Sequence, residues 1–140
     1  MSTAKLTAGT SQSTGISSTT MNAGANLLSS EIDNATNKDR MLDLELAWTC
    51  STASTAGYVV EVYILYAMDG TNYEDGGTSA DPAKNPTRLF VDDGGTGAQR
   101  QTRLQIPLSP FKFKILLKSE LDQNATAVAL LAYTHNDDIS

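Results

Sequence analysis

Apolar and polar residues alternate along several short segments of this chain, which is the pattern that half-buried β-strands produce. In the segment 41–49 (MLDLELAWT), one side of the predicted strand carries Leu42, Leu44, Leu46 and Trp48. The segment 58–66 (YVVEVYILY) has β-branched or aromatic residues on both of its sides. We therefore expect 58–66 to be a central strand, or a strand whose second side is covered by a partner.

Four segments in the second half of the chain continue the pattern, namely 87–93, 100–108, 111–119 and 127–135. A further strand is expected within 25–32. Clusters of Gly, Asn, Asp, Ser and Pro separate these segments, and no long stretch keeps a helical period. The sequence therefore predicts an all-β fold, an antiparallel β-sandwich of jelly-roll type with an extended N-terminal arm.

The segment 100–108 (RQTRLQIPL) gives two more detailed expectations. Its alternation places Leu104, Ile106 and Leu108 toward the core, with Arg103 and Gln105 in water. Pro107 has no backbone N–H to donate, so we expect this strand to lie at a sheet edge or to end there.

Residues 1–24 differ from the rest of the chain because they are rich in Ser and Thr and carry a single charge, on Lys5. Apolar residues are sparse there, with Leu6 and Ile16 the only large aliphatic ones apart from two methionines. Such a segment buries too little surface to offset the entropy lost on ordering. We therefore expect a Ser/Thr-rich arm or flexible tail over 1–24 and a single β-sandwich domain over 25–140. The scarcity of charge favours an arm ordered on a neighbouring subunit.

The composition narrows the class of protein. A length of 140 residues fits one domain, and a net charge of −6 argues against binding to nucleic acid through phosphate neutralisation. The single cysteine, Cys50, leaves no partner for an intrachain disulfide. No apolar run approaches the roughly 18 residues of a membrane span, and no signal-peptide pattern opens the chain. We therefore expect synthesis in the cytoplasm and no contact with a membrane.

Basic residues gather in the segment 94–118, which contains no acidic residue. They are Arg100, Arg103, Lys112, Lys114 and Lys118. Two interpretations are open. The residues lie on solvated outer faces of strands, or they complement the charge of another copy or of an acidic partner.

The loop that follows 58–66 reads DGTNYEDGG over 69–77 and offers oxygen ligands from four residues, Asp69, Asn72, Glu74 and Asp75. Calcium requires such ligands, but their spacing does not match an EF-hand, and Asp-Gly is a common turn pair. A turn is therefore the favoured interpretation. Calcium or ligand binding by 69–77 together with 92–97 stays open, with Tyr73 as either a stacking residue or a loop anchor.

Motifs for known catalytic chemistry are missing from the sequence. It contains no G-x-S-x-G, no phosphate-binding P-loop, no H-E-x-x-H and no C-x-x-C, and its one histidine is His135. We therefore assign no catalytic residue, metal ligand or cofactor, and we expect a protein that is not an enzyme.

Four stretches appear in a distinctive order, namely SSEIDNATN, LDLELAW, VVEVYILYAMDGTNYEDG and IPLSPFKFKILLKSEL. This order resembles small β-sandwich virion proteins of tailed bacteriophages, of the kind that decorate capsids. The resemblance implies a structural protein on the virion surface, present as a homo-oligomer, often a trimer, that binds the major capsid protein as a cement protein. In such proteins an N-terminal segment commonly contacts the shell.

On this basis the residues expected to bind a partner are Lys5, Leu6 and Ile16 of the arm, with Arg100 and Arg103 of the basic segment. Two alternative functions remain open. One is a tail-tube or tail-accessory subunit, because phage sandwiches occur in both places. The other is a carbohydrate-binding β-sandwich module.

Overall fold

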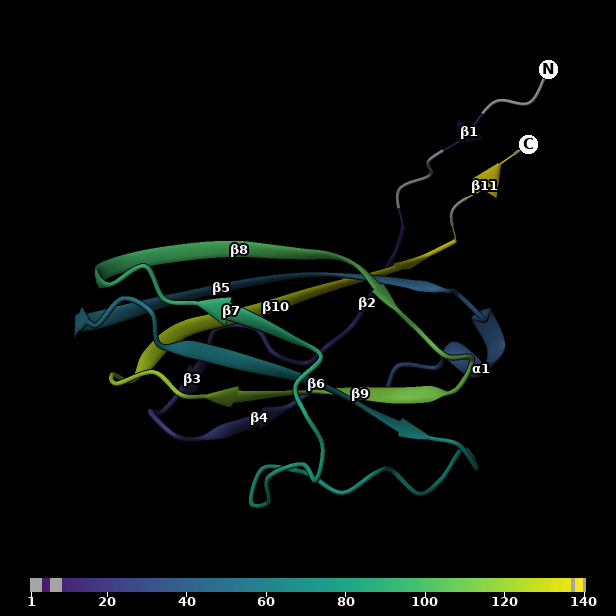
Figure 1. Cartoon of the computed structure of the whole chain (residues 1–140), viewed down its shortest axis with the longest axis horizontal. Helices are drawn as coiled ribbons and strands as arrows, with labels where there is room; N and C mark the ends of the chain where they lie inside the picture. The colour runs from purple at the N-terminus through teal and green to yellow at the C-terminus, as the bar shows by residue number, and fades with distance from the viewer. Residues whose placement is uncertain (1–3, 6–8, 137, 140) are drawn as a thin grey trace.

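Two antiparallel β-sheets face each other and enclose one hydrophobic core (Figure 1). The computed structural model describes residues 4–5, 9–136 and 138–139. The prediction of an all-β, sandwich-like fold is confirmed. The elements are β1 (Ala4–Lys5), β2 (Thr10–Gln12), β3 (Thr19–Met21), β4 (Asn26–Leu28), α1 (Asn34–Asn37), β5 (Met41–Ser54), β6 (Val59–Ala67), β7 (Arg88–Val91), β8 (Gly95–Pro107), β9 (Lys112–Ser119), β10 (Ala125–His135) and β11 (Asp138–Ile139).

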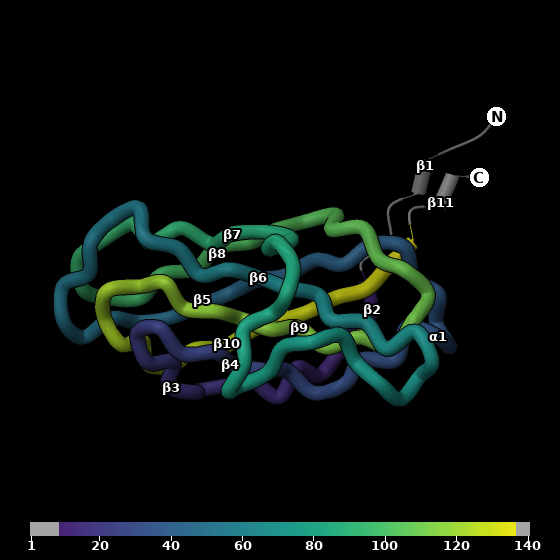
Figure 2. Tube along the Cα trace, turned by 60° about the horizontal axis from the view of Figure 1, so that its bottom comes forward, coloured from purple at the N-terminus to yellow at the C-terminus, as the bar shows by residue number. Residues whose placement is uncertain are grey.

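The strand pairs are nested along the chain. Sheet I has the order β2-β10-β5-β8, with β3 also paired to β10, and sheet II has the order β4-β9-β6-β7. Thus β6 pairs with β7, β5 with β8, β4 with β9 and β3 with β10, all antiparallel. The pairs alternate between the two sheets, so that β8 of sheet I runs beside β7 of sheet II (Figures 1 and 2).

The core is formed by the alternating residues that the sequence predicts for the two longest apolar strands. In β5, the residues Leu42, Leu44, Leu46, Trp48 and Cys50 are buried. In β6, the buried residues Val60, Val62 and Ile64 face the same core. The other side of β6 is also covered, because Tyr63 and Leu65 form a second buried cluster with Leu116 of β9. The expectation of a central, two-sided strand at 58–66 is therefore confirmed.

The strand β8 departs from the expected alternation. Leu104 is 61% exposed, so the expectation that it faces the core is wrong, whereas Ile106 is buried. The cause is a β-bulge. Leu42 pairs with Ile106 but Leu44 pairs with Arg103, so two residues of β8 oppose the single residue Asp43. The Asp43 carboxylate accepts the N–H of Gln105, 2.9 Å away, and Gln105 has a left-handed φ of 57°.

Because of the bulge, the side chains of Gln101 and Arg103 point toward β7 instead of toward water. The expectation that Arg103 lies in water is therefore wrong: its Nε donates to the Leu89 carbonyl, 2.8 Å away. The Gln101 side chain accepts the Val91 N–H at 3.1 Å and donates to the Val91 carbonyl. These contacts satisfy backbone groups on the edge of β7 that would otherwise be open to pairing with another chain. Pro107 ends this edge strand, as the sequence predicts.

Residues 9–24 lie within the sandwich, where an arm or tail was expected. β2 and β3 both pair with β10, and Met21 and Ile16 are buried in the core. The hydroxyl of Thr14 donates to the Leu130 carbonyl at 2.7 Å, and the Leu130 N–H donates to the Ile16 carbonyl at 3.0 Å. Leu6, and the side chain of Lys5, lie outside the described residues.

Replacing Met21 with Ala tests whether residues 9–24 contribute to the stability of the sandwich. Met21 is fully buried, so we expect Met21→Ala to lower the free energy of unfolding by about 2–5 kcal/mol in urea denaturation. The matched control is Thr20→Ala, an exposed position in the same strand, which should change it by about 0.5 kcal/mol or less. Equal stability of the two variants would show that this segment is an appendage to an independently stable domain.

Candidate interaction surface

The outer face of sheet I carries three large apolar side chains that remain exposed. Leu131 and Tyr133 project from β10, and Leu104 projects from the bulge of β8, with exposed fractions of 46%, 40% and 61%. They line a depression of about 300 Å³ together with Gly9 and Thr102. We call this surface of β10, β5 and β8 the open face. Contiguous exposed apolar residues of this kind are typical of a binding surface.

A second depression of about 350 Å³ lies further along the open face. Small residues line it, namely Ala47, Thr49, Ala98 and Ala127, with Arg100 at its margin. The strand register gives the order along the face: Tyr133 lies opposite Asp43, Leu131 opposite Glu45, and Ala129 opposite Ala47. The open face therefore has a bulky end and a hollow end.

The charged side chains of the open face have bonding partners within the chain. The Glu45 carboxylate lies 2.9 Å from the Arg100 guanidinium. The Asp43 carboxylate lies 3.0 Å from Nε2 of His135 and also accepts the Gln105 N–H. Glu45 and Arg100 cancel each other, so with His135 counted as neutral the charge that remains among these residues is that of Asp43, against −6 for the whole chain.

The loop 68–87 covers the outer side of β6 and β9 in sheet II, whereas Leu89 and Val91 of β7 stay exposed. The buried side chains of Tyr63, Leu65 and Leu116 lie beneath this cover. Gly76 lies so close to Leu65 and Pro82 that a β-carbon on it would be 3.3 Å from either residue. The two outer faces of the sandwich therefore differ in what they offer to a partner.

Polar contacts attach the loop to the sheet. The Lys84 ammonium donates to the Ile64 carbonyl and lies 2.9 Å from Glu74. Burial would raise the pKa of Glu74, but the Tyr66 N–H and the Lys84 ammonium lower this pKa below its ordinary value. The Asn26 amide donates to the Gly77 carbonyl at 3.0 Å. The acidic side chain of Glu74 therefore serves to hold the loop in place.

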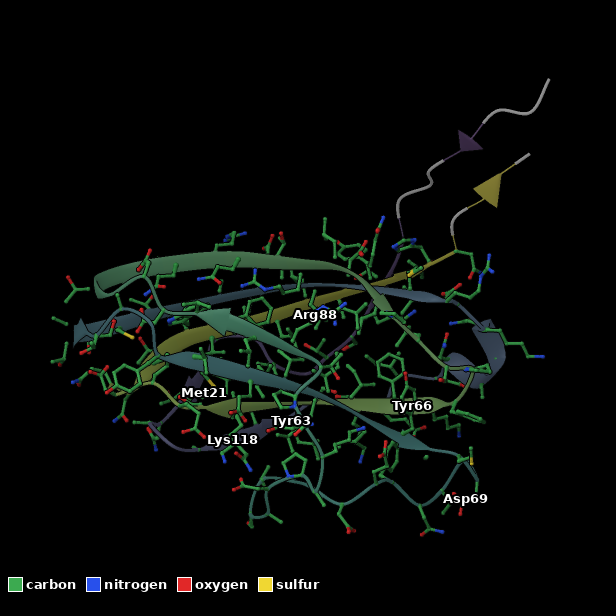
Figure 3. The ribbon with its side chains drawn as sticks, in the orientation of Figure 1. Met21, Tyr63, Tyr66, Asp69, Arg88 and Lys118 are labelled. Carbon is green, nitrogen blue, oxygen red and sulfur yellow. The ribbon has the colours of Figure 1, made fainter. Side chains whose placement is uncertain are left out.

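Asp69 and Tyr73 of this loop also have partners in the chain. Figure 3 shows Asp69 in the turn beyond the end of β6. Its carboxylate accepts the N–H groups of Asn72 at 2.7 Å and Thr71 at 2.8 Å, as in an Asx turn. Chiefly the backbone and side-chain N–H groups of Asn72 lower the pKa of Asp69 to about 2. The Tyr73 hydroxyl donates to Glu31, and the Lys114 ammonium lies 4.5 Å from the centre of its ring.

The basic segment 94–118 does not form one surface. Arg100 lies on the open face beside Glu45, whereas Arg103 points toward β7 with its guanidinium 5.0 Å from the Phe90 ring. Lys118 of β9 forms ion pairs with two acids, and its hydrogen bonds to Asp81 and Glu120 raise its pKa above the ordinary value. Of the residues expected to bind a partner, Ile16 lies in the core, so the structure does not bring the described ones together.

The residues that form the open face were not singled out by the sequence analysis. Leu131 and Tyr133 occupy one side of a segment whose other side, with Leu130 and Ala132, is equally apolar. A strand that is apolar on both sides has one apolar side left over when the other packs in the core. This property of 127–135 is the sequence feature that indicates an exposed apolar surface. The bulge that exposes Leu104 leaves no comparable trace in the sequence.

Neither a protein-family model nor a curated protein nor a solved structure matches the chain. Within residues 4–5, 9–136 and 138–139, no helix is long and apolar enough to cross a membrane. Across the same part of the chain, no group of three or more His, Cys, Asp or Glu residues is placed to bind a metal ion.

Asp69→Asn tests the turn at the start of the loop. An acid with a lowered folded pKa stabilises the fold above its ordinary pKa of about 4 and loses that effect as the pH falls toward its folded value. We therefore expect Asp69→Asn to be less stable than the wild type at pH 7. The difference should shrink as the pH falls from about 4 to about 2, the folded pKa of Asp69.

The measurement is urea denaturation across this pH range, with Asp75→Asn, an exposed position in the same loop, as the matched control. A difference for Asp69→Asn that stays constant with pH would mean that its carboxylate charge does not stabilise the turn.

Proposed function

We propose that this chain is a non-enzymatic structural protein of a tailed-bacteriophage virion, which binds the outer capsid surface and stabilises the shell as a decoration protein. The observation that carries the proposal is the nested order of the strand pairs. Four nested antiparallel pairs shared between two facing sheets are what a jelly roll requires, and this fold recurs in viral capsid proteins and in lectins. We accordingly propose a jelly-roll topology for β3 to β10.

The polar side chains of the loops bond to groups of the same chain. This supports binding to another protein over binding of a small ligand by the loops. Asp69, Glu74 and Asp81 are bonded to backbone or basic groups of the same chain, so they hold loops in fixed positions. A rigid scaffold with preformed loops loses little conformational entropy on binding a large flat partner. The major capsid protein is the partner that the proposal names.

A decoration protein that binds only the assembled shell stabilises it by mass action. Each occupied site contributes about 2.7 kcal/mol when the free protein is at a hundred times its dissociation constant. Because a shell contains many equivalent sites, this contribution is repeated over the particle. The proposed role therefore requires many copies and a fold that stays intact when bound, but no reactive group.

A carbohydrate-binding module is the main competing function, because lectins share the proposed topology. Tyr73 is the aromatic residue best placed in the loop to stack on a sugar. One of its ring faces is already opposed by the Lys114 ammonium, and its hydroxyl donates to Glu31. These contacts fit a loop anchor better than a sugar platform.

The proposal predicts that virions of the phage that encodes this chain contain it in many copies on the capsid. Particles that lack it should release their DNA at a lower temperature, and addition of the purified protein should restore the wild-type temperature. Quantitative mass spectrometry and thermal DNA-release assays measure the two effects.

Three results would contradict the proposal. Particles without the chain that are as stable as wild-type particles would exclude cementing. A label found on the tail would favour the tail subunit. Binding to a glycan array that is lost in Tyr73→Ala, with no capsid occupancy, would favour the carbohydrate-binding module.

A further inference from the structure

The open face has the composition of a surface that is covered in the working state of the protein. Leu104, Leu131 and Tyr133 lie around one depression, each at least 40% exposed. Apolar residues of this size are normally scattered singly on a monomer surface. In sheet II the loop 68–87 covers β6 and β9 and leaves Leu89 and Val91 of β7 exposed, whereas the three exposed residues of sheet I line a common depression.

Electrostatics favours another copy of this chain as the partner. Two molecules with a net charge of −6 repel each other, and they can associate only through surfaces that add little to this repulsion. The open face meets this condition, because Glu45 is paired with Arg100 and the charge that remains there is the single one of Asp43. The neighbouring sheet edge, formed by residues 9–24, has no charged residue. A basic partner would instead be attracted to the acidic loops elsewhere.

The two ends of the open face differ in the size of their side chains. Leu131 and Tyr133 form its bulky end, and the small residues Ala47, Ala98 and Ala127 line the hollow end. A twofold axis that lies in the plane of the interface, midway between the two ends and perpendicular to the strands, places the bulky end of one copy over the hollow end of the other. In such an isologous contact the same residues serve both copies.

We propose that the open face is the interface of a twofold-symmetric pair of this chain, in which Leu131 and Tyr133 of each copy pack into the alanine-lined hollow of the other. The contact does not depend on the virion role. It differs from the trimer that the family resemblance implies, because a twofold axis relates two chains.

The first test is the mass of the purified full-length chain, measured by sedimentation equilibrium. We expect a dimer, and a strictly monomeric chain at about 100 μM would overturn the proposal. Because the interface is apolar and the chains repel, the dissociation constant should fall as NaCl is raised from about 50 to about 500 mM. A contact made of ion pairs would respond in the opposite direction, so weakening by salt would also overturn the proposal.

Variants then locate the interface. Leu131→Lys places a charge in it while facing Glu45 of its own strand pair, and we expect the dissociation constant to rise roughly 30-fold or more. Leu89→Lys, an equally exposed leucine on sheet II, is the matched control and should leave it unchanged. Dimers weakened by Leu89→Lys and not by Leu131→Lys would place the interface elsewhere and overturn the proposal.

A third variant tests the packing of the bulky end into the hollow. Ala98→Phe fills the hollow on an exposed edge strand without adding charge, so it should also weaken the dimer. Unchanged association would refute the twofold arrangement. Circular dichroism establishes that each variant is folded, and Leu104→Ser, at the most exposed of the three apolar positions, replaces Leu131→Lys if that variant does not fold.

Discussion

The bulge of β8 opposite Asp43 is the local feature on which two others depend. These are the bonded outer edge of β7 and the exposed apolar surface of sheet I. A regular strand through 99–106 would direct Leu104 to the core and the side chains of Gln101 and Arg103 to water. The extra residue reverses this arrangement, and the Asp43 carboxylate stabilises it by accepting the N–H of Gln105. A backbone N–H that has lost its partner in the ladder is thereby satisfied by a side chain.

The same reversal has consequences on two sides of β8. Toward the interior, Gln101 and Arg103 bond to the outer backbone groups of β7, so this sheet edge is closed without another strand. Toward the exterior, Leu104 joins Leu131 and Tyr133 and enlarges the apolar surface of sheet I. One inserted residue thus protects the sandwich from edge pairing and at the same time creates a surface that favours face-to-face contact.

The sequence predicted the parts of the fold that follow from side-chain periodicity alone. The alternation in 41–49 and the apolar character of both sides of 58–66 correspond to β5 and β6 as the structure has them, because the register shift of β5 lies beyond 49, between Cys50 and Ser54, and β6 keeps its register throughout. Periodicity failed at 104 because a bulge shifts the period by one residue. The argument from composition failed for 9–24, where strand pairing with β10, two buried apolar side chains and the Thr14 hydroxyl hold a polar segment in the sandwich.

The candidate site was harder to predict than the fold, for a related reason. A surface composed of residues from β5, β8 and β10 depends on their register, which a linear pattern does not contain. Charge clustering in the sequence pointed to 94–118, but the strands distribute these residues over an interior, an open and a loop-covered side. The informative property was instead the low net charge of one surface. In a chain with a net charge of −6, a second copy would meet the least electrostatic cost at a surface of low net charge, and in this molecule such a surface also exposes the largest apolar residues of sheet I.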